Sequence, residues 1–104
     1  MGTYHLAYKG GTMAETDAER EASMAAWGAF LGGLGDQLVD AGNPFGPATT
    51  VAPGGAVSDG AASGLSGYSI ISSGSLSDAT ATAKGCPILS QGGSVEVHEI
   101  FPVM

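Results

Sequence analysis

Residues 92–101 read GGSVEVHEIF, and the strict alternation of apolar and polar residues at their centre predicts a β-strand. Val95 and Val97 fall on one side of this strand and Glu96 and His98 on the other, because successive side chains point to opposite faces of a sheet. The ionisable row indicates that the second face of the sheet meets polar surroundings. This row is therefore the first candidate for a functional surface.

Residues 3–9 read TYHLAYK and predict the first strand, since they are rich in residues that favour β-structure. Alternation again defines two faces. One face carries Tyr4, Leu6 and Tyr8, and the other carries His5, Ala7 and Lys9.

Thr16 and Glu19 form a capping box, which predicts the start of a helix. An apolar stripe with spacings of three and four residues predicts nearly five helical turns: Met24, Trp27, Leu31, Leu34 and Leu38. Gly42 and Pro44 predict its end. The glycines at 28, 32 and 35 lie mostly along one side, so we expect the helix to approach another backbone closely there.

The remaining residues predict a short strand at 48–52, a mobile loop at 56–67, a strand at 67–73 and a second helix from about 75 to 84. The order β-α-β-β-α-β is typical of an α+β ferredoxin-like fold, in which two helices cover one face of a four-stranded antiparallel sheet. We expect a single domain over residues 1–104. The other sheet face stays bare in so small a chain, so we also expect a homodimer whose sheets meet face to face.

The net charge of −7, with only three basic residues, argues against nucleic acid as a partner, because phosphate binding needs a basic surface. Cys86 is the only cysteine, which excludes an internal disulfide and fits a reducing cytoplasm. No apolar run is long enough to span a membrane, and the N-terminal residues lack the layout of a signal peptide. We expect a cytoplasmic protein without membrane or nucleic-acid partners.

Several segments, in order along the chain, resemble the YCII-related (DGPF-domain) family. They are residues 27–46, 57–60 (VSDG), 67–71 (GYSII) and 83–97, of which the ending with Cys86-Pro87 and GGSVEV is the most specific. The resemblance implies a dimeric α+β barrel of ferredoxin-like subunits. It also implies that a few relatives carry out lyase-type chemistry, while most have no established activity.

The chain departs from that family at two places. Asp59-Gly60 is followed by Ala61-Ala62-Ser63 rather than by the Pro-Phe of the DGPF motif. The catalytic pair proposed for some members also needs a histidine on the first helix, whereas the only histidines here are His5 and His98. No catalytic role is therefore carried over from that pair.

In a ferredoxin-like sheet the last strand runs beside the first, so His5 and Lys9 share a face with Glu96 and His98. Imidazole titrates near neutrality and a carboxylate can orient it, so these groups can perform acid–base catalysis, and Lys9 can hold an anionic substrate. Solvated or interfacial polar residues are the alternative interpretation. A metal held by the two histidines and Glu96 fits chemically, but the spacing matches no known motif, and we predict none.

Asp59 is a second candidate catalytic residue, because it lies on the predicted loop beside the sheet, although Asp-Gly is also an ordinary turn dipeptide. Trp27, Phe30 and Tyr68 are expected in the core or a pocket wall, with Tyr68 also a candidate ligand contact. Cys86, before a proline, is expected to be a buried apolar residue.

Two hypotheses about function follow. The first is a lyase or isomerase that acts on a small molecule by acid–base chemistry without a cofactor, using His98, His5 and Asp59. The second is a non-catalytic dimeric module that binds a small molecule or a partner protein.

Overall fold

β1 (Gly2–Lys9) and β5 (Leu65–Ser73) form the centre of a four-stranded antiparallel sheet in the computed structural model, which describes residues 2–11 and 15–102. β2 (Leu38–Asp40) pairs with the outer side of β5, and β6 (Ser94–Ile100) pairs with the outer side of β1, so the order is β2-β5-β1-β6. Together with helices α1 (Asp17–Gly33) and α2 (Leu76–Ala83), the sheet confirms the predicted α+β class.

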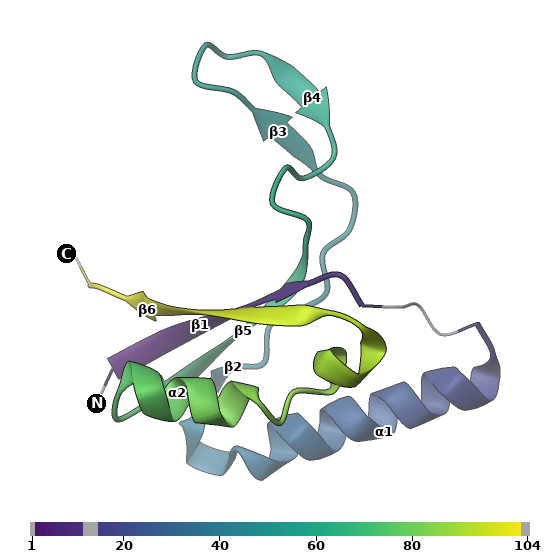
Figure 1. Ribbon diagram of the computed structural model, residues 1–104, viewed down its shortest axis with the longest axis vertical. Helices are drawn as coiled ribbons and strands as arrows, with labels where there is room; N and C mark the ends of the chain where they lie inside the picture. Colours follow the sequence, from purple (N-terminus) through teal and green to yellow (C-terminus); the bar gives the residue numbers. More distant parts are fainter. Residues whose placement is uncertain (1, 12–14, 103–104) are drawn as a thin grey trace.

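Both helices lie on one side of the sheet (Figure 1). The sheet residues that face them form the core with residues of α2 and of η2, the 3-10 helix at Pro87–Gln91. The buried core residues are Tyr4, Leu6, Tyr8, Ile71, Ala79, Ala83, Cys86 and Ile88. The alternation in β1 and β5 thus sorts the helix-facing residues from those on the opposite, open face, as predicted.

The predicted helix starts are confirmed. The Thr16 side chain accepts a hydrogen bond from the Glu19 backbone N–H at the start of α1, and Ser75 accepts one from the Asp78 N–H at the start of α2. Each contact satisfies one of the backbone donors that a helix leaves without a partner in its first turn.

The predicted end of the first helix was wrong. α1 ends at Gly33, and the chain passes through the 3-10 helix η1 (Gly35–Gln37) into β2. Glycines at 32, 33 and 35 weaken the helix here, and Gly35 takes a positive φ of 54°. Leu38 still packs against the core, but it does so from a strand, opposite Ile71.

The predicted mobile loop at 56–67 was also wrong, because it contains β4 (Val57–Asp59) and the start of β5. β4 pairs with β3 (Thr49–Val51), so the predicted strand at 48–52 exists but forms a separate two-stranded hairpin instead of joining the main sheet. The Pro53-Gly54-Gly55 turn explains this, since it returns the chain at once to an antiparallel neighbour.

This hairpin projects from the side of the sheet that the helices leave uncovered (Figure 1). We call residues 46–64 the arm. Every residue of the arm is exposed except Thr50, which is half-buried. The radius of gyration of 15.1 Å exceeds the value of about 13 Å expected for a compact domain of this length, as a projecting arm requires.

α1 packs loosely, since none of its residues is buried. The close approach expected at Gly28, Gly32 and Gly35 is absent: among the described residues, no atom outside the local backbone lies within 4 Å of a Cβ built on any of the three. No helix in the described part of the chain is long and apolar enough to cross a membrane.

Candidate functional site

A cavity of about 490 Å³ lies between α1 and the sheet, on the helix side. Its walls come from the end of β1, from α1, from the segment 41–44 that follows β2, from the start of β5 and from η2. The main lining side chains are Tyr8, Ser23, Met24, Trp27, Leu31, Asn43, Pro44, Ser69, Ile88 and Gln91.

Two glycines let the segment 41–44 lie directly against β5 and form one wall. Gly42 has a φ of +72°, and a Cβ at this position would overlap the carbonyl oxygen of Tyr68. Gly67 faces the same segment from β5, where a Cβ would lie 3.1 Å from the Asn43 carbonyl oxygen. The backbones meet here because neither residue has a side chain.

A hydrogen-bonded chain ties three segments together at this wall. The buried Tyr8 hydroxyl donates to Ser69 Oγ at 2.8 Å, and Ser69 Oγ donates to the Ala41 carbonyl oxygen at 2.7 Å. Burial raises the pKa of Tyr8 to about 12, so its hydroxyl stays protonated at neutral pH. Cys86 is buried beside this group, as predicted, and burial raises the pKa of its thiol as well.

Aromatic contacts hold α1 over the cavity. The rings of Tyr8 and Trp27 meet edge to face with centroids 5.0 Å apart, and Trp27 meets Phe30 in the same way at 6.2 Å. Trp27 and Phe30 are half-buried against the core, and Trp27 also lines the cavity. Trp27 is thus a pocket wall, as one of the two expectations had it, and it packs against the core without being buried in it.

The cavity is apolar with a few uncharged hydrogen-bonding groups. The Gln91 side-chain amide donates to Ser23 Oγ at 3.0 Å across the gap between η2 and α1. No histidine, lysine, arginine or carboxylate is found among the described residues that line the cavity. A charged ligand would lose its hydration there without a counter-charge, so the cavity favours an uncharged, largely apolar molecule.

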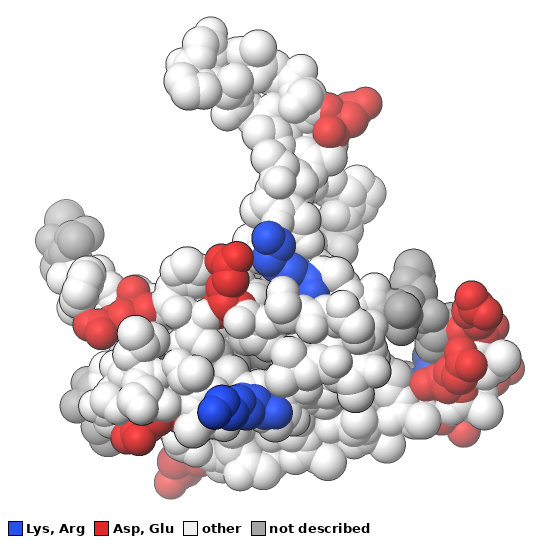
Figure 2. All heavy atoms as spheres, in the orientation of Figure 1, with Lys and Arg blue, Asp and Glu red and all other residues white. Residues whose placement is uncertain are grey.

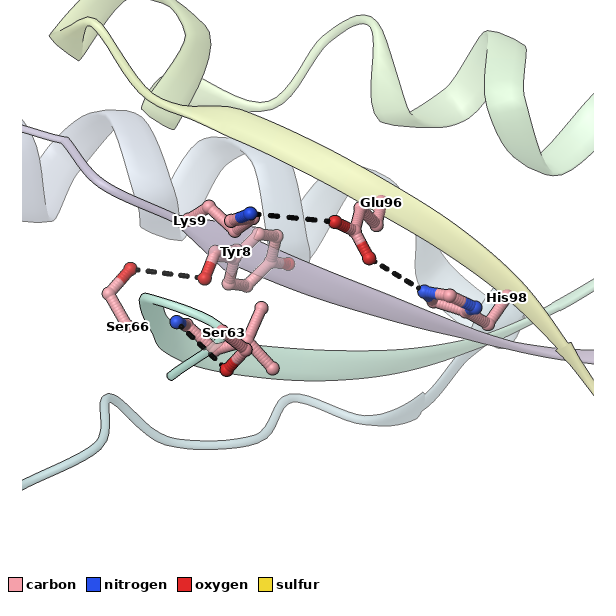
Figure 3. Close-up of polar contacts among 7 residues, drawn as sticks. Tyr8, Lys9, Ser63, Ser66, Glu96 and His98 are labelled. Carbon is pink, nitrogen blue, oxygen red and sulfur yellow. Dashed lines mark hydrogen bonds and ion pairs between the residues drawn. The ribbon is translucent and has the colours of Figure 1, made fainter. Parts of the chain in front are cut away.

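The predicted polar row occupies the open face. His98 and Glu96 are joined by a contact of 3.0 Å between His98 Nε2 and Glu96 Oε1, and Lys9 Nζ lies 3.8 Å from Glu96 Oε2 (Figure 3). The hydrogen bond from His98 lowers the pKa of Glu96, and Lys9 lowers it further. Glu96 is therefore an ionised carboxylate that orients the imidazole of His98, the arrangement expected of an acid–base pair.

His5 extends this row across the sheet. It lies opposite His98 in the strand register, with ring centroids 6.4 Å apart, and stacks on Tyr68 at 5.7 Å. Tyr68 in turn stacks on Phe45 at 5.8 Å and donates a hydrogen bond to Asp40 Oδ2 at 3.2 Å, which raises the pKa of the Tyr68 hydroxyl. We call this surface, from Lys9 to Phe45, the open-face row.

Five of the six candidate site residues meet on this row: His5, Lys9, Tyr68, Glu96 and His98. The sixth, Asp59, lies on β4 in the arm, and no hydrogen bond or ion pair among the described residues joins it to the row. Asp59 is the only acidic residue of the arm, and Figure 2 shows acidic atoms on the arm apart from those of the body.

The sequence did not predict the cavity, because its walls come from segments that meet only in the folded chain. The one sequence signal was the cluster of special residues at 41–44, Ala-Gly-Asn-Pro, which was interpreted only as a helix stop. A glycine with a positive φ beside a proline also fits a tight wall against a strand.

No group of three or more His, Cys, Asp or Glu side chains among the described residues is placed to hold a metal ion. Comparisons of the chain with family models, with curated proteins and with solved structures give no match. The function is therefore argued from the geometry of the cavity and of the open-face row.

Proposed function

We propose that this chain is a small-molecule-binding protein that holds an uncharged, largely apolar ligand in the cavity under α1, and that it works as a homodimer of ferredoxin-like subunits. The cavity is the observation that carries the proposal. Its volume of about 490 Å³ lies within the range of ligand pockets, and its apolar walls with a few fixed polar groups match their composition.

Loose packing of α1 supports the same conclusion. A helix with no buried residue over a cavity leaves apolar surface of Met24, Trp27 and Leu31 partly exposed. A ligand that fills the cavity would remove this surface from water, at a gain of about 25 cal/mol per Å². The ligand would therefore stabilise the fold as it binds.

The dimer part of the proposal rests on the open face. The strand order β2-β5-β1-β6, with both helices on one side, supports the proposal of a ferredoxin-like subunit, whose bare sheet face is free to pack against a second sheet. With a net charge of −7, two copies repel one another. The open face reduces this repulsion, since its acids Glu96 and Asp40 are engaged by Lys9, His98 and Tyr68.

A thermal-shift screen of uncharged metabolites tests the ligand, with binding confirmed by calorimetry. A ligand at about 100 times its dissociation constant stabilises the native state by about 2.7 kcal/mol. Ser23→Phe places a ring in the cavity, so we expect it to abolish the shift. Ala25→Phe is the matched control, because Ala25 is exposed on α1 and does not line the cavity. A ligand that binds both variants equally would contradict the proposed site.

Light scattering at micromolar concentration tests the dimer separately. A mass of twice 10.2 kDa is expected. A monomer would overturn the dimer and leave the cavity proposal intact, because all described walls of the cavity belong to one chain.

Acid–base catalysis is the second candidate function, and the contact between Glu96 and His98 favours it. A lyase or isomerase that uses His98 as its base would remove a proton from a carbon atom of a substrate bound on the open face, so wild-type protein should exchange a substrate C–H for deuterium in heavy water. His98→Gln should abolish the exchange, whereas Glu99→Gln, one residue further along β6, should retain it. Exchange that survives His98→Gln would exclude His98 as the base.

A further inference from the structure

The arm carries an apolar patch that no described residue of its own chain covers. Val51 and Val57 lie directly opposite one another in the β3–β4 register, so their side chains share one face of the hairpin. Each is 66% exposed. Ala52 and Ala56, joined by a hydrogen bond of 2.8 Å, continue the hairpin toward its turn and are exposed as well.

A two-stranded hairpin of this kind is marginally stable by itself in water. Strands of three residues supply few hydrogen bonds, and both faces of this hairpin meet solvent. Packing against another surface would remove the two valines from water and fix the hairpin. The arm is therefore expected to have a partner.

The part of the body that the structure describes does not supply that partner. The described hydrogen bonds of residues 48–60 all go to residues between 48 and 62, including those of the Thr50 hydroxyl with Gly60 and Ala62. No core residue lies in the arm. Figure 1 shows the hairpin standing clear of both helices and of the sheet.

Three observations point to a second copy of this chain. The arm rises on the side of the sheet that the helices leave bare, where the proposed partner sheet would pack (Figure 1). The eight residue steps from Phe45 to the turn at Pro53 can reach at most about 26 Å, which is more than the spacing of about 10 Å between stacked sheets. Asp59 is the only charged residue between Asp40 and Asp78, so the arm adds almost no repulsion between two acidic chains.

We infer that the β3–β4 arm of each protomer wraps the body of a second copy, with Val51 and Val57 packed against the partner and Asp59 contributed to its surface. The inference rests on the homodimer proposed above and adds the element that holds its two protomers together. We call this packing of each arm against the body of the other protomer the clasp. Both the arm and the open face then belong to the dimer interface. Contact with the partner holds residues 46–64 in a fixed position.

Photo-crosslinking tests the clasp directly. Benzoylphenylalanine at position 57 should link two chains into a product of twice the monomer mass, with the crosslink mapping to a body residue of the other chain. The same probe at position 24, on the helix side of the molecule, is the control and should give monomer. A light-scattering dimer in which position 57 gives no intermolecular product would overturn the clasp while keeping the homodimer. A monomer by light scattering would overturn both.

A matched pair of surface substitutions measures the energetic contribution of the arm. The double variant Val51→Ser and Val57→Ser should raise the dimer dissociation constant at least about tenfold, because two valines would no longer be buried between the chains. Met24 lies on α1 and is 69% exposed, so Met24→Ser should leave the dimer dissociation constant unchanged. No core residue is touched, so both proteins should fold with wild-type circular dichroism. An unchanged dissociation constant in the double variant would overturn the clasp.

Discussion

Tyr8 joins three segments at the cavity wall, because its hydroxyl bonds Ser69, which in turn bonds the Ala41 carbonyl. Its ring also supports Trp27 of α1. One side chain from β1 therefore fixes the position of β5, of the segment after β2 and of the helix above the cavity.

Tyr8→Phe should lower the free energy of unfolding by about 1 kcal/mol near pH 8, the usual contribution of one such hydrogen bond. The folded pKa of about 12 lies above the ordinary value of 10.0, so this residue contributes stability that is complete below pH 10 and falls as the pH rises toward 12. Phenylalanine does not ionise, so the Tyr8→Phe variant does not lose this stability. The difference in free energy of unfolding between the two proteins should therefore become smaller as the pH rises. Urea unfolding at pH 8 and pH 11 measures this difference. The same difference in free energy of unfolding at both pH values would contradict burial of the Tyr8 hydroxyl.

Glu96 should titrate below its ordinary pKa of 4.5 in the folded chain, because His98 donates a hydrogen bond to its ionised form. The lowered pKa means that this contact stabilises the fold above pH 4.5, and that the gain is lost as the pH falls through the folded value. His98→Ala should move the pKa toward 4.5, and Lys9→Ala should move it less. Carbon-detected NMR of the Glu96 carboxyl measures its pKa in each protein. A larger change in Lys9→Ala than in His98→Ala would mean that Lys9, and not His98, is the main cause of the lowered pKa.

Alternation within each strand, together with the expected placement of the last strand beside the first, predicted that His5 shares a face with His98 and that Leu6 shares the other face with Val97. Stacking of His5 on Tyr68 was not, since it depends on the register between β1 and β5. The sequence thus predicted which residues share a face, but not which of them touch.

Among the elements, α2 and the outer strand β6 were predicted from local signals, namely a Ser75 cap and strict alternation. Between α1 and β5 only the short strand at 49–51 was predicted, and its place outside the main sheet was not. Leu38 satisfies a helical spacing and a strand pairing equally well, and only contact with Ile71 selects the strand. Tertiary packing overrides local preference in this region.

Gly42→Ala should destabilise the chain by about 2 kcal/mol or more, since the new Cβ would overlap the Tyr68 carbonyl and a φ of +72° is unfavourable for alanine. Gly46→Ala is the control. That position has no positive φ and no atom within 4 Å among the described residues, so stability should change little. Thermal unfolding compares the two, and equal midpoints would mean that the segment 41–44 is free to move away from β5.

At the scale of the whole molecule, the sheet separates two surfaces of different character. The helix side holds an uncharged cavity, and the other side holds the open-face row and the arm. Binding and self-association can therefore be changed independently by mutation, which makes the two parts of the proposed function separable.

Added salt should tighten the proposed dimer. Each chain carries a net charge of −7, and raising the ionic strength from about 50 mM to about 500 mM shortens the screening length from more than 10 Å to less than 5 Å. We expect the dissociation constant to fall about threefold or more, measured by sedimentation equilibrium. A rise in the dissociation constant would mean that ion pairs between the chains outweigh their mutual repulsion.

Because α1 packs loosely on the rest of the chain, its backbone amides should exchange hydrogen with solvent readily. A helix without a buried residue opens at low cost, so its amides should exchange with solvent long before those of β1 and β5, whose central residues are buried. A molecule that occupies the cavity must hold α1 in place to stay bound. Slower exchange across Asp17–Gly33 would then report occupancy for any compound, without knowledge of its chemistry.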